Sequence, residues 1–141
     1  MGILDGFLKS KKEQDDQLIN FLYAKSDALS SDQITELIRY AFLSFGDCGM
    51  GFSLVRFLVQ KISKKIGSEF TPNNKAEFEN WMKEVFSKVS AEEKKAIFVT
   101  LVFDIYQHSV FSGSEVMLKI DAMIADLQKM PDFQNLAKKE F

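Results

Sequence analysis

Residues 30–45 read SSDQITELIRYAFLSF, and this stretch decides the fold class of the chain. Its large apolar residues recur at intervals of three and four, which is the period of one face of an α-helix. Ser30 and Gln33 fit a capping box, in which each side chain satisfies a backbone N–H at the start of a helix. We therefore predict an amphipathic helix that begins at Ser30 or Ser31, with this inward stripe: Ile34, Leu37, Ile38, Ala41, Phe42 and Phe45.

The sequence on both sides repeats this helical period. Gly67 is placed as a helix C-cap, and Ser90 with Glu93 forms a second capping box. Trp81 lies in the middle of an apolar stripe and is predicted to be buried. No segment alternates with a period of two, so no strand is predicted. We predict an all-α, compact single domain over residues 1–141, with six or seven helices. Besides the helix of residues 30–45, they span residues 13–26, 52–66, 74–89, 91–109 and 132–139, with one more helix between the break at residues 112–114 and Pro131.

The apolar pattern of residues 18–45 recurs 60 positions later. Leu18 falls on Phe78 and Phe42 on Val102, while the two serine caps fall on each other. The pseudo-repeats cover about residues 13–67 and 73–130, and each reads helix, serine cap, helix, glycine break, helix. Shared helical phase produces part of this match by itself, so duplication of a three-helix unit and chance similarity both stay open.

The composition limits the kinds of function that the chain can have. It holds 14 Phe but one His and one Cys in 141 residues, and its formal net charge is −2. This charge gives no general basic field that would attract nucleic acid. A single cysteine cannot form an internal disulfide, which is consistent with a reducing compartment. We therefore expect a cytoplasmic protein that binds no nucleic acid and carries no cofactor.

Asp104 and His108 are the candidate catalytic residues. With Thr100 they stand four residues apart on one face of the most apolar predicted helix. The functional interpretation is a histidine oriented by a carboxylate, as in a general base or half of a metal site. The structural interpretation, which we prefer, is the narrow solvent face of a buried helix. No second histidine and no HExxH motif accompanies the pair.

We interpret the glycine-rich segment of residues 46–51, and the cysteine within it, as structural features. The segment Gly46–Gly51 precedes a helix, as phosphate-binding loops do, but a helix and not a strand comes before it. We predict a tight turn between two helices there. Cys48 in this segment has no obvious His or Lys partner, so we predict an ordinary loop cysteine.

The N-terminal segment, residues 1–12, is amphipathic. Ile3, Leu4, Phe7 and Leu8 would share one face of a helix, and lysines follow at positions 9, 11 and 12. Such a segment can touch a membrane surface or a groove on a partner protein, although four apolar side chains give weak membrane affinity. We expect it to dock on its own domain or to fray.

Tyr40, Leu43 and Phe57 are large apolar residues that fall outside the inward stripes of their helices. A short glycine segment joins the two helices, so they are predicted to be antiparallel neighbours. Apolar groups left outside the core commonly mark a partner or dimer interface. We predict an interaction patch formed by these three residues. The alternative is that one of the two helices is sandwiched in the core and all three residues are buried.

The N-terminal string MGILDGFLKSKK and the paired three-helix layout resemble tellurite-resistance TerB-type helical proteins. In that family, acidic residues at the turn between helices are associated with metal binding. This chain departs from the pattern at both turns, because Asp47 has no Glu after it at the expected distance and Glu115 follows a Ser-Gly-Ser turn without Asp-Gly. The resemblance therefore transfers no metal ligand to this chain.

Together these features predict a small, non-enzymatic protein–protein interaction module of bacterial or phage origin, with a protein partner or a homodimer. Two alternatives stay open. One is a degenerate TerB-like metal-binding or hydrolytic protein that uses Asp104 and His108. The other is a protein that contacts a membrane surface through its N-terminal segment.

Overall fold

A computed structural model describes the backbone of residues 3–46, 53–67 and 69–137, and the side chains of residues 12–45, 54–67 and 69–137. Every regular element in these ranges is an α-helix, and none is a strand. The helices are α1 (Ile3–Asp27), α2 (Ser31–Gly46), α3 (Ser53–Lys65), α4 (Lys75–Phe86), α5 (Ala91–Gln107), α6 (Gly113–Gln128) and α7 (Pro131–Ala137). The predicted all-α bundle of six to seven helices is confirmed.

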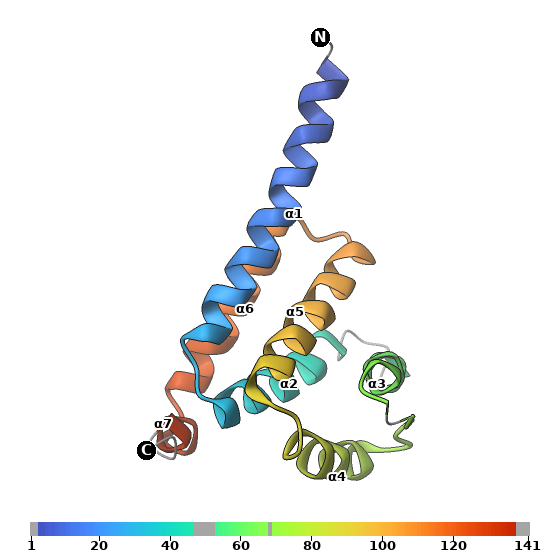
Figure 1. Ribbon diagram of the computed structural model, residues 1–141, viewed down its shortest axis with the longest axis vertical. Helices are drawn as coiled ribbons and strands as arrows, with labels where there is room; N and C mark the ends of the chain where they lie inside the picture. The colour runs from blue at the N-terminus through green and yellow to red at the C-terminus, as the bar shows by residue number, and fades with distance from the viewer. Residues whose placement is uncertain (1–2, 47–52, 68, 138–141) are drawn as a thin grey trace.

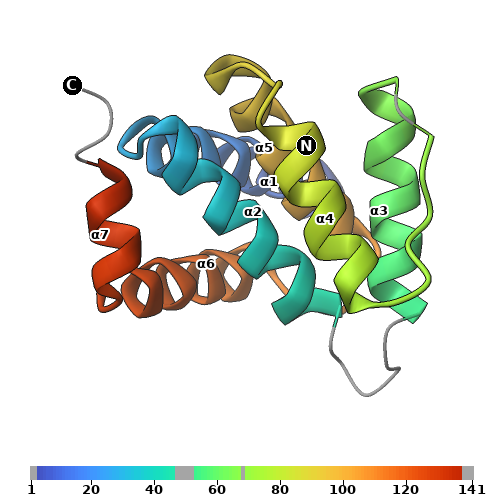
Figure 2. The same cartoon turned by 90° about the horizontal axis from the view of Figure 1, so that it is seen from below.

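Helices α2 and α5 pack against each other at the centre of the bundle. Helix α1 packs on α5 and lies side by side with α6 (Figure 1). Helices α3 and α4 both contact α2, and α7 contacts α2 and α6. Seen from below, α7 closes one end of the bundle and α3 forms the opposite end (Figure 2). The apolar stripes therefore meet around one central helix pair.

Aromatic side chains fill the core between α2 and α4. The Phe42 ring lies 5.6 Å from that of Phe78 and 6.0 Å from that of Trp81, in edge-on arrangements. Trp81 also meets Phe86 edge-on at 5.3 Å and stacks on Phe70 at 6.2 Å. Only 4% of Trp81 is exposed, so its predicted burial is confirmed.

The capping residues set the helix boundaries. Ser30 Oγ accepts from the Gln33 backbone N–H and Gln33 Oε1 accepts from the Ser30 N–H, which confirms the predicted capping box. Gly67 ends α3 with a φ of 73°, a left-handed conformation that favours glycine. Ser90 accepts from the Glu93 N–H at the start of α5.

Lys94 on α5 is buried, which the sequence pattern did not predict. Its ammonium donates to Ser31 Oγ at 2.8 Å and so ties α5 to the first residue of α2. A buried charge needs hydrogen-bonding partners because it has lost its hydration. Lys94 therefore helps to fix how the two central helices pack.

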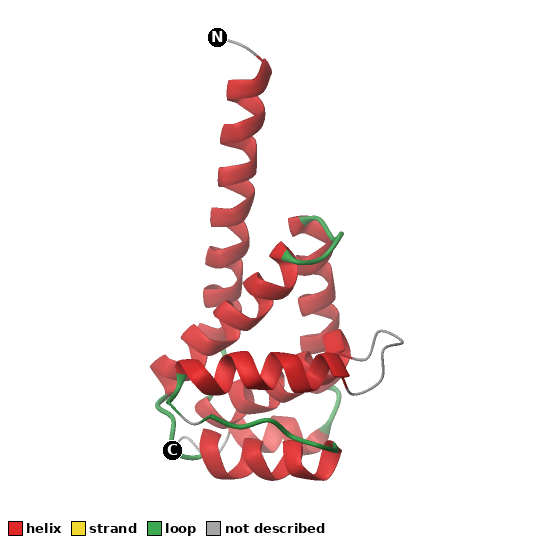
Figure 3. Ribbon diagram, turned by 90° about the vertical axis from the view of Figure 1, so that its right-hand side faces the viewer, coloured by secondary structure: helices red, strands yellow, loops and turns green. Residues whose placement is uncertain are grey.

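Helix α1 begins ten residues earlier than the helix predicted over residues 13–26. The N-terminal half of the α1 ribbon extends past all the other helices (Figures 1 and 3). A helix that is already formed grows at little cost, since only nucleation is strongly unfavourable. The packed half of α1 therefore supports the helical conformation of the N-terminal half.

The 60-residue offset also appears in the helix boundaries. Ser31 and Ala91 begin α2 and α5, while Ser53 and Gly113 begin α3 and α6. Leu18 and Phe78, which are equivalent under this shift, are both fully buried. These correspondences agree with a repeated three-helix unit, and the duplication itself stays a prediction.

Candidate functional site

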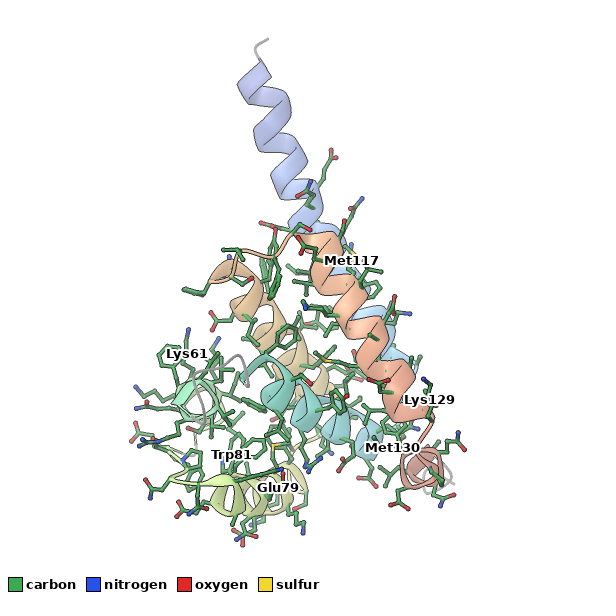
Figure 4. The ribbon with its side chains drawn as sticks, turned by 180° about the vertical axis from the view of Figure 1, so that it is seen from behind. Lys61, Glu79, Trp81, Met117, Lys129 and Met130 are labelled. Atoms are coloured by element: carbon green, nitrogen blue, oxygen red, sulfur yellow. The ribbon has the colours of Figure 1, made fainter. Side chains whose placement is uncertain are left out.

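A groove of about 560 Å³ opens between α3 and α6, with the C-terminal ends of α2 and α5 along its base. In Figure 4, α3 (with Lys61) and α6 (with Met117) lie on opposite sides of α2. We call this feature the α3–α6 groove. Its apolar lining residues are Tyr40, Phe45, Leu54, Phe57, Leu58, Ile105, Phe111, Ala122 and Met123, and its polar ones are Ser44, Asp104, His108, Ser109, Lys119 and Asp126.

The apolar base of the groove comes from helix stripes that continue to the molecular surface. Phe45, Leu58 and Met123 are buried core residues from three different helices. Leu54 and Ile105 are half-buried and pack against that core. The base is therefore held by the core itself and is rigid in the way that packed interiors are.

Phe57 forms the α3 side of the groove and is 54% exposed, which is unusual for a phenylalanine. The Lys61 ammonium lies 5.4 Å from the centre of its ring. Across the groove, the Lys119 ammonium lies 4.5 Å from the ring of Phe111. Both distances are short enough for cation–π attraction. Each side of the groove thus presents an aromatic ring next to a lysine.

The α2–α6 side is closed by a hydrogen bond. Tyr40 Oη donates to Asp126 Oδ2 at 3.2 Å. Burial, together with this bond to a carboxylate, raises the pKa of Tyr40 above its ordinary value. The Tyr40 ring is half-buried and packs against the core. Tyr40 is therefore a neutral, positioned aromatic side chain at neutral pH.

The two candidate catalytic residues both line this groove. Asp104 Oδ2 accepts from the Lys61 ammonium at 2.7 Å, which joins α5 to α3. His108 lies at the C-cap of α5, and its Nδ1 is 2.9 Å from the backbone carbonyl oxygen of Asp104. A carbonyl only accepts, so Nδ1 donates and Nε2 is the acceptor of the neutral ring. The Asp104 Oδ1 to His108 Nδ1 distance is 3.6 Å, which is too long for a hydrogen bond.

This geometry favours the structural interpretation of the pair. The His108 side chain is 72% exposed, and Asp104 is occupied by a lysine from another helix. Within the described ranges, no group of three or more His, Cys, Asp or Glu residues is placed to hold a metal ion. The pair therefore contributes polarity and a helix cap to the wall of the groove.

The structure brings together two of the three residues of the predicted interaction patch. Tyr40 and Phe57 line the α3–α6 groove, whereas Leu43 lines a neighbouring groove of about 480 Å³ along α2. Tyr40 and Ser44 border both grooves, so the two grooves are neighbours along α2. Tyr40 and Leu43 are half-buried, so neither full exposure nor full burial describes them.

The remaining sequence candidates fall largely outside the described side chains. Ile3, Leu4, Phe7 and Leu8 lie on the described backbone of α1, but their side chains do not belong to the described part. Cys48 and most of the Gly46–Gly51 segment also lie outside the described residues. Within the described ranges, no helix has the length and the apolar character needed to cross a bilayer.

Phe111 and Met123 are groove residues that sequence reasoning missed. Met123 belongs to the inward stripe of α6, and its sequence signal is that of an ordinary core residue. Phe111 lies between α5 and α6 beside the 98% exposed Val110, and two adjacent apolar residues in a polar turn are a signal that could have found it.

No protein-family model, no curated protein and no solved structure matches this chain.

Proposed function

We propose that this chain is a non-enzymatic interaction module whose α3–α6 groove binds the apolar face of an amphipathic helix. The observation that carries this proposal is the mostly apolar lining of the groove, with half-exposed Phe57 on one side. Docking an amphipathic helix in an apolar groove is a common mode of peptide recognition. Aromatic side chains at the centre of an interface commonly supply much of its binding energy.

The dimensions of the groove support a helical ligand. Its volume of about 560 Å³ lies within the range of small binding sites, roughly 300–1,000 Å³. Such a volume can take apolar side chains from one face of a helix, but not the whole helix. The lysines beside Phe57 and Phe111 would then flank the ligand, where they can meet carboxylates or carbonyl oxygens.

The cellular setting is part of the proposal. The single cysteine supports a reducing compartment, so we propose a cytoplasmic location. We also propose a bacterial or phage origin for this module.

One observation favours metal binding as a second candidate function. Because His108 Nδ1 is held by a backbone carbonyl, its Nε2 is left as an acceptor at the edge of the groove. An imidazole oriented in this way is suited to coordinate a metal ion. Lys61 competes for Asp104, however, so a single histidine would carry most of the affinity.

A peptide selection tests the proposed groove, because it needs no identified partner. A phage-displayed library of helical peptides is selected against the full chain, and binding is measured by fluorescence anisotropy. We expect peptides with apolar residues at i, i+3 or i+4 and i+7, whose affinity falls about tenfold or more for Phe57→Glu. Leu118→Glu is the matched control, because Leu118 is 69% exposed and does not line the groove. Peptides that bind both variants equally well would contradict the proposal.

A further inference from the structure

The N-terminal half of α1 extends beyond the bundle. Helix α6 begins beside Gln14 of α1, since a Cβ added to Gly113 would lie 3.9 Å from the Gln14 carbonyl oxygen. Tyr106 Oη donates to Asp15 Oδ1 at 3.0 Å, at the same level of α1. Residues 3–13 of α1 precede both points, and the N-terminal half of the helix stands clear of the other helices (Figure 3). At about 1.5 Å per residue, these residues add roughly 16 Å of helix.

The packing face of α1 continues in phase into this extension. Positions 4, 8, 11, 15, 18 and 22 follow one another at alternating steps of four and three, so they lie along one side of the helix. Leu18 and Leu22 on this line are fully buried by the rest of the bundle. Leu4 and Leu8 occupy the same line beyond the bundle, and Ile3 and Phe7 are adjacent to it.

This extension cannot reach the groove of its own chain. Helix α1 is continuous to Asp27, and Leu18 and Leu22 hold its C-terminal half in the core. Folding the N-terminal half back would break the helix. The same chain therefore carries an apolar helix face and an apolar groove that can meet only between two molecules.

The charged residues of the extension and of the groove are compatible with such a contact. Lysines at positions 9, 11 and 12 follow the apolar residues of the extension, and Asp5 is the one acid before them. The lining of the groove carries two carboxylates, Asp104 and Asp126, and one ammonium, that of Lys119. Lys61 pairs with Asp104, whereas Asp126 accepts a hydrogen bond from the neutral phenol of Tyr40. Asp126 is therefore the carboxylate that can meet a lysine of the extension.

We propose that the α3–α6 groove receives residues 3–11 of α1 from a second copy of this chain. The inference rests on the proposed function, since it names the helix that the groove binds. Reciprocal insertion uses each helix and each groove once and closes into a two-fold dimer, the commonest form of homo-oligomer. The dimer thus covers both apolar surfaces in one step.

Sedimentation equilibrium of the full chain tests the dimer. We expect a mass of twice 16.1 kDa over the micromolar range. Phe7→Glu places a charge on the docking face and should weaken association by about tenfold or more. Gly6→Glu adds the same charge on the other side of the helix and should leave the dimer within about twofold of wild type. A wild-type chain that stays monomeric would overturn the inference.

Mixing two defective variants tests which surfaces meet. Phe7→Glu keeps an intact groove and Phe57→Glu keeps an intact helix, so a mixture can restore one of the two contacts. We expect the mixture to associate more strongly than either variant alone. No restoration would mean that both residues belong to some other shared interface, and this result would also overturn the inference.

Two further outcomes separate this inference from the proposed function. If the wild-type chain is monomeric but selected peptides still bind in the groove, the groove has a different partner and only the second-copy inference fails. If a monomeric chain floats with vesicles of anionic phospholipid and Phe7→Glu does not, the extension is a membrane contact and the inference is again overturned.

Discussion

Removal of the Trp81 side chain should lower the free energy of unfolding by a clearly measurable amount. Trp81 is 4% exposed and lies among four aromatic rings, with Phe42, Phe78 and Phe86 from the core and Phe70 stacked on its outer side. Its Nε1 is buried and has no hydrogen-bond partner in the described part of the structure. The substitution Trp81→Ala therefore removes a large apolar surface and one unsatisfied donor together.

The magnitude follows from these two effects. A buried tryptophan removes roughly 150–250 Å² from water. At about 25 cal/mol per Å², this burial is worth about 4–6 kcal/mol. Loss of the unsatisfied N–H returns about 1–3 kcal/mol. We expect Trp81→Ala to lower the free energy of unfolding by about 3 kcal/mol, at the lower end of the usual range for such core deletions.

Urea unfolding followed by circular dichroism at the helix band measures this change. Trp81→Phe is the informative second variant, because it keeps a ring and removes the unsatisfied N–H. We expect it to cost less than about 1.5 kcal/mol. Phe57→Ala is the matched exposed control and should cost less than Trp81→Ala. A loss below about 1 kcal/mol for Trp81→Ala would refute the core assignment.

Four further substitutions probe other parts of the structure. Ser112→Ala removes the hydroxyl that accepts from the Glu115 N–H in the capping box of α6 and should cost about 1 kcal/mol in the same unfolding assay; an unchanged stability would contradict this assignment. Burial and the hydrogen bond to Asp15 raise the pKa of Tyr106, so the stability that the neutral phenol contributes is present below about pH 10 and is lost as pH rises through the higher folded value. Unfolding measured as a function of pH should therefore show a smaller alkaline loss for Tyr106→Phe than for wild type. Asp104→Asn should change stability by less than about 1 kcal/mol, because the pair with Lys61 is partly exposed. A zinc titration isotherm that disappears in His108→Ala would instead favour the metal-binding alternative.

The sequence predicts a helix boundary best where a capping residue sets it through local hydrogen bonds or local backbone conformation. Ser30 and Gln33 satisfy backbone N–H groups at the start of α2, and Gly67 ends α3. Both effects are local, so they can be predicted without the tertiary structure. The capping box of Ser112 and Glu115 has the same signature, but the glycine between them also indicates a break in the chain and hides it.

Tertiary effects explain what the sequence could not predict. Residues 3–12 read as a separate segment because Gly6 and the lysines weaken the helical signal. Their helical conformation depends on the packed half of α1. Lys94 occupies a position in line with the apolar stripe of α5. Its burial cannot be predicted without knowing that Ser31 lies within hydrogen-bonding distance.

The candidate site shows the same limit. Tyr40 and Phe57 are recognisable as apolar residues outside the stripes, and Asp104 is recognisable as part of a polar line. That all three face one groove depends on how α2, α3 and α5 pack, and on the ion pair of Lys61 that joins α3 to α5. Helical period alone carries no information about that arrangement.

Site-specific photo-crosslinking from position 57 tests the central claim most directly. The full chain carries p-benzoylphenylalanine in place of Phe57, with a second protein labelled in place of Leu118 as the control. After irradiation, mass spectrometry identifies the adduct and its attachment site. The account predicts an adduct of twice 16.1 kDa from position 57, attached within residues 3–11 of the second chain, and none from position 118. Equal crosslinking from both positions, or no adduct from position 57, would contradict the claim that the α3–α6 groove receives the N-terminal helix of a second chain.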